Sequence, residues 1–131
     1  MSQGIQGYVG VAQWDIGATP FTLLSAGVTE DKTVVKASAG ILKSLHVTNV
    51  NAAVAYVKFY DKATVPAVAS DTPVAVFRVP GGATGTQSII PFPPEGIAFA
   101  TGIAFVIVTG VAITDATEVA ANEVIVNGSY K

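Results

Sequence analysis

Short runs of apolar or alternating residues, broken at intervals by Gly, Pro and Asn, constrain this chain more than any other feature. Val, Ile and Thr surround the abundant Ala, and no apolar period of 3.6 residues continues far enough to predict a long helix. β-Branched residues favour strands, and the residues between the runs are typical of turns. The sequence therefore predicts an all-β fold.

The runs fall at a spacing that is typical of a β-sandwich or barrel. The expected strands are Thr33–Ser38, Ile41–Thr48, Ala53–Asp61, Val74–Val79, Thr86–Ile90, Gly102–Thr109 and Val124–Tyr130. One or two further strands are expected before them, around Tyr8–Gln13 and Phe21–Leu24. We therefore expect an antiparallel β-sandwich, and the strand count and long corner loops favour a jelly roll.

A chain of 131 residues is long enough for one core, and a second domain would leave each half near the lower size limit. We divide the chain into residues 1–30, an N-terminal arm with a first strand, and residues 31–131, the β-sandwich domain. The arm is rich in Gly and Gln around Tyr8 and Trp14. Two interpretations of it remain open: a disordered tail, or an arm whose aromatic residues bind a neighbouring subunit.

The uncharged stretch from Gly96 to Thr114 approaches the ~20 residues that a membrane span needs. Glycines interrupt it and threonines dilute it, so two buried strands joined by a turn fit better than a span. We expect no contact with a membrane.

The segment that follows predicts one short helix. Asp115-Ala116-Thr117-Glu118 places a glutamate three residues after a capping residue, and Val119-Ala120-Ala121 comes next. This is a capping-box pattern ahead of a single helical turn.

Alternation assigns the two faces of the strand Ala53–Asp61. Ala55, Val57 and Phe59 share a wholly apolar face, which we expect to pack in the core. The opposite face carries an ammonium and two phenols, on Tyr56, Lys58 and Tyr60, which we call the Tyr/Lys stripe. We expect the stripe to meet solvent or a partner. It could stack on a sugar, contact another protein, or simply cover an outer sheet face.

In the preceding strand, Ile41, Lys43, Leu45 and Val47 alternate with Leu42, Ser44, His46 and Thr48. The set that contains Leu45 and Val47 is the more apolar and is expected to face the core. Lys43 belongs to this set, near the strand end, where its aliphatic stem could extend outward to solvent.

Composition excludes several classes of function. Charged residues make up 12% of the chain, about half of the usual ~25%. The formal net charge is −2 and no basic run exists, which argues against binding to nucleic-acid phosphates. The chain has no Cys, so thiol nucleophiles, thiolate metal sites and disulfides are excluded.

Motifs that carry chemistry are scarce. His46 is the single histidine, and although Ser44 shares its face, no Gly-x-Ser-x-Gly elbow is present. The carboxylates Asp61, Asp71, Asp115, Glu118 and Glu123 lack the spacing of a calcium loop, and turns and caps explain them more simply. Pro80–Gly85 is glycine-rich, but a strand and not a helix follows it, so we expect a hairpin connection rather than a phosphate loop. We expect no catalytic site, metal or cofactor.

Two parts of the chain carry a family resemblance. The first is Tyr56–Thr64 (YVKFYDKAT) with Asp71–Val74 (DTPV). The second is Phe99–Ile107 (FATGIAFVI) with Asn122–Val124 and the ending Gly128–Lys131. Together they resemble small structural proteins of tailed-bacteriophage virions and prophages, over approximately residues 35–131. The resemblance implies a β-sandwich on the particle surface, such as a head decoration (cement) protein, with no catalytic residue to transfer.

The expected function is therefore that of a non-enzymatic virion structural protein, most simply a homo-oligomeric capsid decoration protein. Its partners would be copies of itself and a capsid or other virion protein, with Tyr8, Trp14, Tyr56, Lys58 and Tyr60 as candidate interface residues. The alternative is a carbohydrate- or receptor-binding β-sandwich of a tail or head fibre, with a glycan at the Tyr/Lys stripe. Met1–Gly7 has no basic start and no apolar run, so we expect no secretory signal and assembly into virions in the host cytoplasm.

Overall fold

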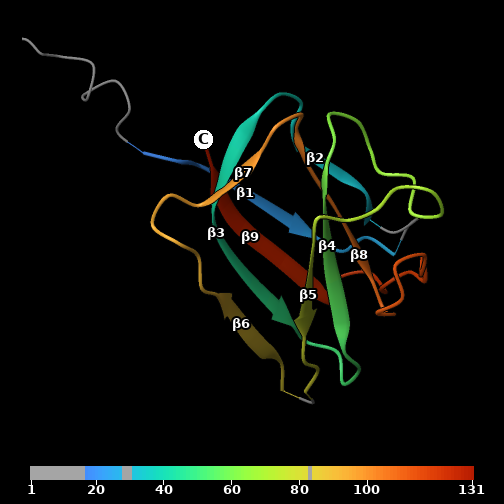
Figure 1. Cartoon of the computed structure of the whole chain (residues 1–131). Coiled ribbons are helices and arrows are strands. Elements are labelled where there is room, and N and C mark those ends of the chain that lie inside the picture. Colours follow the sequence, from blue (N-terminus) through green and yellow to red (C-terminus); the bar gives the residue numbers. More distant parts are fainter. Residues whose placement is uncertain (1–16, 28–30, 83) are drawn as a thin grey trace, which may run out of the picture.

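The computed structural model describes residues 17–27, 31–82 and 84–131, which form two antiparallel sheets (Figure 1). The strands are β1 (Thr19–Leu24), β2 (Thr33–Lys36), β3 (Gly40–Asn49), β4 (Ala55–Asp61), β5 (Ala75–Val79), β6 (Thr86–Ile90), β7 (Ile97–Phe99), β8 (Ile103–Val108) and β9 (Val124–Tyr130). The expected all-β sandwich is confirmed.

The strands of the two sheets pair in a nested order. Sheet A has the order β1-β9-β3-β6, with β7 also paired to β3, and sheet B has the order β2-β8-β4-β5. The first strand thus pairs with the last, β2 with β8, β3 with β6, and β4 with β5. Such pairing brings residues far apart in the chain side by side, so the sandwich forms only when the whole chain has folded back on itself.

Most strands lie where the runs predict them. β6 and β9 match their predicted bounds, and the strand predicted around Phe21–Leu24 is β1, an edge strand of sheet A. The uncharged stretch after Gly96 forms β7 and β8 with a turn between them, as expected. The strand predicted at Tyr8–Gln13 lies outside the described residues.

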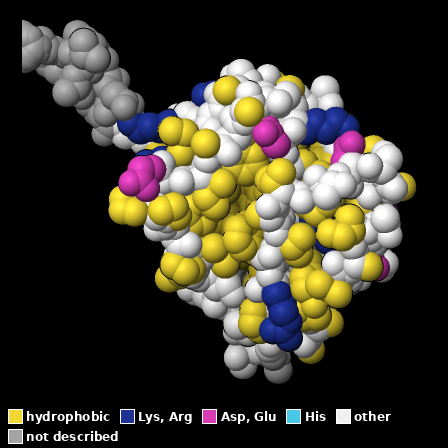
Figure 2. Space-filling view, in the orientation of Figure 1, with side chains coloured by type: hydrophobic (Ala, Val, Ile, Leu, Met, Phe, Trp, Pro, Cys, Tyr) yellow, Lys and Arg dark blue, Asp and Glu magenta, His cyan; other side chains and the backbone are white. Residues whose placement is uncertain are grey.

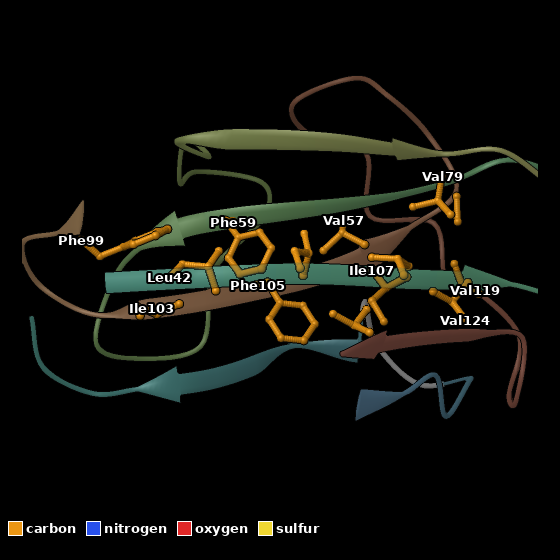
Figure 3. Packing of buried hydrophobic residues seen from close by; sticks show 14 residues of the cluster. Leu42, Val57, Phe59, Val79, Phe99, Ile103, Phe105, Ile107, Val119 and Val124 are labelled. Carbon is orange, nitrogen blue, oxygen red and sulfur yellow. The ribbon is translucent and has the colours of Figure 1, made fainter. Parts of the chain in front are cut away.

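The core lies between the sheets and is built from the predicted inward face of β4 (Figure 3). Val57 and Phe59 have no exposed surface, and Ala55 retains 2%. The Phe59 ring lies 5.2 Å from that of Phe105 and 5.9 Å, edge-on, from that of Phe77. Each buried aromatic ring removes a large apolar area from water, which is the main contribution to stability in such a core.

The prediction for β3 is wrong over its first half. Leu42 is 1% exposed, like Leu45, although regular alternation would place these two residues on opposite faces of the strand. The pairing with β9 shifts register between Leu42 and Ser44, which marks a β-bulge. The bulge turns Leu42 into the core and Lys43 outward, where its Nζ donates to the carbonyl oxygens of Pro94 and Glu95.

The short helix predicted at Asp115–Ala121 is also absent. The Asp115 carboxylate accepts a hydrogen bond from the Thr117 backbone N–H, which forms a local turn instead of a helix cap. The segment then runs alongside the end of β8, with Glu118 bridged to Val108 and the Thr109 N–H bonded to the Thr117 carbonyl. Val119 is thereby buried in the core at 3% exposure, which favours the extended path.

Candidate functional site

The Tyr/Lys stripe is not a solvent-facing surface, contrary to the prediction. Lys58 is fully buried and Tyr60 is 1% exposed, although both point away from the core between the sheets. They belong instead to a second layer, in which the segments 62–74 and 109–119 cover the outer face of sheet B. Val68 and Ala116, one from each segment, pack in the cluster around Tyr60. Alternation identified the face correctly but could not show that loops cover it.

Lys58 anchors one of these covering segments. Its Nζ donates to the carbonyl oxygen of Ala112 at 2.5 Å and to that of Asp115 at 3.2 Å. Burial lowers the pKa of Lys58, and the nearby Asp115 carboxylate opposes that effect. The lysine therefore links sheet B to residues 112–115 through these two hydrogen bonds, and its ammonium is not available to an outside ligand.

Tyr56 is the one member of the stripe that stays partly exposed, although it too packs in the second layer. Its direct cross-strand neighbour is the exposed Arg78 of β5. This pairing places Arg78 beside Tyr56 on the same face of sheet B. Lys58 and Tyr60 are covered. Tyr56 and the adjacent Arg78 are therefore the part of this face that a partner could contact.

The outer face of sheet A is a broad surface that no other part of the described chain covers. It is formed by the outward residues of four strands, namely Pro20, Thr22 and Leu24 of β1, Ile125, Asn127 and Ser129 of β9, Ser44, His46 and Thr48 of β3, and Gln87 and Ile89 of β6. None of these carries a carboxylate, ammonium or guanidinium group. The one charged residue in the four strands is Lys43, which the bulge turns toward the 91–96 segment.

Neutral hydrogen bonds connect neighbouring strands across this face. The Thr22 hydroxyl bonds the Asn127 amide oxygen at 2.7 Å, and the hydroxyls of Ser44 and Ser129 lie 2.6 Å apart. His46 Nε2 lies 3.0 Å from Gln87 Oε1. These bonds satisfy part of the hydrogen-bonding capacity of the face within the sheet, so covering the face breaks fewer hydrogen bonds to water than it would if these side chains were unpaired.

Two large apolar side chains on the same face are left in water. Ile89 is 76% exposed, directly across from His46, and Leu24 is 44% exposed. Isolated exposed apolar residues are ordinary, but here they lie within an uncharged surface. Protein interfaces are depleted of charge at their centres, so this face has the composition of a contact surface.

The scattered carboxylates have structural roles in turns. Asp61 accepts hydrogen bonds from the backbone N–H groups of Thr101, Gly102 and Ala100, which lowers its pKa. Asp71 is held by the Lys62 ammonium at 2.5 Å and by the Ala67 N–H, and these contacts lower its pKa. Within the described part of the chain, no three His, Asp or Glu side chains gather in a way that could hold a metal ion.

A pocket of about 30 Å³ lies near Asn49, Ala53, Val119 and Glu123, far below the ~300–1,000 Å³ of ordinary ligand sites. The hairpin predicted at Pro80–Gly85 is wrong, because this segment crosses from β5 of sheet B to β6 of sheet A, and the two strands do not pair. Gly81 lies close to the backbone of Ala52. No helix within residues 17–27, 31–82 or 84–131 is long and apolar enough to cross a membrane.

The sequence thus predicted five interface residues. Of these, the structure brings together only the three of the Tyr/Lys stripe. Tyr8 and Trp14 lie outside the described residues. The outer face of sheet A was missed, although a signal existed: β1, β6 and β9 have no charged residue between them. That signal gains meaning only when the strand order shows that these strands lie in one sheet.

Fold and surface together define an all-β sandwich that presents a broad uncharged sheet face. Comparison of the chain with family models, with curated proteins and with solved structures gave no match.

Proposed function

We propose that this chain is a non-enzymatic structural protein of a tailed-phage virion, a capsid decoration protein that binds the head through subunit contacts. The uncharged outer face of sheet A is the observation that carries the proposal. A surface of Thr, Ser, Asn and aliphatic side chains can be buried against a shell without desolvating charges, which is the main cost of covering a polar surface.

Two further observations support the proposal. The nested strand pairing is the pattern of a long hairpin rolled into two sheets, which we propose is a jelly roll, a fold common in viral shell domains. The resemblance of Tyr56–Thr64 and Phe99–Ile107 to phage structural proteins lies within this sandwich. Because a fold does not define a function, the particle itself must supply the test.

The alternative of glycan binding at the Tyr/Lys stripe has lost its structural support. It required Tyr56 and Tyr60 to present their rings to a sugar, but Tyr60 is 1% exposed beneath the 62–74 segment. A ring must present its face to stack on a sugar, so Tyr60 would have to be uncovered first.

Direct localisation tests the proposal. Virions are purified on a density gradient from lysates of the bacterium that encodes the chain, and a gold-labelled antibody against the chain is imaged on them. We expect label distributed over the heads. Virions that lack the chain, or that carry it only on tail tips, would contradict a role in decorating the capsid.

A charge placed on the outer face of sheet A tests the binding surface. Ile89→Lys should reduce co-sedimentation with particles stripped of the protein by about tenfold or more, because an unpaired ammonium would be buried in the contact. Ile89 is 76% exposed, so the fold should tolerate the change. Val65→Lys, at a 54% exposed position on the 62–74 segment, is the matched control and should bind like the wild type. Equal binding of all three proteins would rule out this face as the contact.

A further inference from the structure

The two sheets separate along the side of the sandwich where β5 and β6 are the edge strands. Each of these strands has one hydrogen-bonded neighbour in the described chain, β4 for β5 and β3 for β6. Figure 2 shows hydrophobic side chains gathered over the middle of the face on which Figure 1 draws β5 and β6. The core is therefore incompletely covered here.

Five residues form this surface, which we call the β5/β6 seam: Ala75, Phe77, Ile90, Phe92 and Ile97. All five pack against the buried core, yet each keeps part of its surface in contact with solvent. Phe77 also contacts the core ring of Phe59 edge-on. The seam is thus a continuation of the core to the surface and not a set of scattered apolar side chains. Surfaces of this kind typically mark interaction sites.

The segment of chain with the chemistry to cover the seam is residues 1–16. It contains Ile5, Tyr8, Val9, Val11, Trp14 and Ile16, and Asp15 is its one charged side chain. Ala12, Trp14 and Ile16 alternate with Gln13 and Asp15, a period that presents one apolar side when the chain is extended. Sixteen residues reach up to about 50 Å, more than the width of one sandwich.

The strand order favours the seam of a second copy over that of the same chain. Residues 1–16 lead into β1, and β1 and β6 are opposite edges of sheet A. In a head-to-tail arrangement the β1 edge of one copy lies beside the β6 edge of the next, which brings the segment directly to the neighbouring seam. Reaching its own seam would require the segment to cross the whole sheet.

We propose that residues 1–16 of one copy bind the β5/β6 seam of a second copy, with Trp14 buried against the Phe77 and Phe92 side of the seam. This inference rests on the self-association part of the proposed function, but not on the presence of a virion. Burial of a tryptophan in a desolvated apolar site is a typical way for a short segment to hold its partner.

Trp14 is the single tryptophan of the chain, so its fluorescence reports on this segment alone. For the full chain at high protein concentration we expect an emission maximum shifted to shorter wavelength than that of free tryptophan. The shift should disappear on dilution and in the seam variant Phe92→Ser. Ala69→Ser, at an exposed position in the 62–74 segment, is the control that should retain the shift. Emission like that of free tryptophan at every concentration would overturn the proposal, as would a shift that persists at the lowest protein concentration.

Disulfide trapping provides a second test that does not depend on the stability of Phe92→Ser. The chain has no Cys, so Ala12→Cys and Phe92→Cys can be placed in separate molecules and mixed under mild oxidation. Docking should make the mixed disulfide form about tenfold or more faster than the Ala12→Cys pairing with Val65→Cys. Equal rates would overturn the proposal. Both measurements use the free protein, so their failure is separate from failure to find the chain on virions.

Discussion

The Lys58 ammonium is fully buried against the outer face of sheet B, where two carbonyl oxygens replace the water that a surface lysine would bind. Removing a lysine from water is costly unless hydrogen bonds compensate. Here the compensation comes from Ala112 and Asp115, which lie far along the chain but directly above β4 in space. One side chain thus determines how residues 112–115 sit on the sheet.

Replacing Lys58 by methionine should lower the free energy of unfolding by about 1–3 kcal/mol, because the carbonyl oxygens of Ala112 and Asp115 would lose their donor. Chemical denaturation measures the change, and hydrogen exchange should show faster opening of residues 111–115. Lys36→Met, at a half-buried site on β2, is the control and should change stability by less than about 0.5 kcal/mol. An unchanged denaturation midpoint for Lys58→Met would show that the hydrogen bonds from Lys58 to residues 112–115 do not stabilise the fold.

Asp61 makes the turn between β7 and β8 sensitive to acid. Hydrogen bonds from the Thr101, Gly102 and Ala100 N–H groups hold the pKa of Asp61 below its ordinary value. The stabilisation is therefore fully present above the ordinary pKa and is lost as the pH falls through the lowered pKa of the folded state. Asp61→Asn should melt below the wild type at pH 7, and the difference in Tm should shrink toward pH 2. Glu95→Gln serves as a control, and a difference that is constant across pH would contradict this role.

At the scale of strands, the β1–β9 pair depends on a glycine opposite an aromatic ring. Phe21 of β1 pairs with Gly128 of β9, and the Phe21 ring packs over the space where a β-carbon would lie. A β-carbon at residue 128 would be 2.5 Å from Phe21 Cζ and 2.7 Å from the Ser44 carbonyl oxygen. The glycine thus lets Phe21 lie across β9 and reach the core ring of Phe105, 6.0 Å away.

Gly128→Ala should therefore destabilise the protein by about 1–3 kcal/mol through overpacking. The loss should appear as a lower urea midpoint with an unchanged slope. Gly17→Ala, where nothing lies within 4 Å of an added β-carbon, should leave the midpoint unchanged. If the two variants unfold at the same urea concentration, the space above Gly128 is not needed by Phe21.

At the scale of the whole molecule, the sandwich carries two surfaces that could each be covered in an assembly. The outer face of sheet A is uncharged and hydrogen-bonded across its strands, whereas the β5/β6 seam is an opening of the core. They involve different strands or different sides of the same strand, so a subunit can use one for a shell and the other for a neighbouring copy.

Removing residues 1–16 tests how far the sandwich is independent of this segment. A chain that begins at Gly17 keeps all of β1, which starts at Thr19, and should melt within about 2 °C of the full chain. It should no longer self-associate and should bind particles less well than the full chain. A truncated chain that fails to fold would show that the segment is part of the core, and unchanged co-sedimentation would show that it contributes nothing to assembly.

The sequence by itself determined the all-β class and most strand positions, because alternation and turn residues are local properties of the chain. It also identified the inward face of β4, since Ala55, Val57 and Phe59 are apolar whatever packs on them. Local patterns could not reveal the bulge beside Lys43. A bulge adds one residue to a strand, and the alternation of apolar and polar residues before that point stays the same.

Only the tertiary structure decided which surfaces meet water. Lys58 and Tyr60 look exposed by alternation, but segments 62–74 and 109–119 fold over them. Asp115 looks like a helix cap, but burial of Val119 draws its segment along β8. The uncharged face exists because the strand order places β1, β9, β3 and β6 side by side. Each of these outcomes depends on contacts between residues far apart in the chain, whose free energies exceed the local preferences that a sequence pattern records.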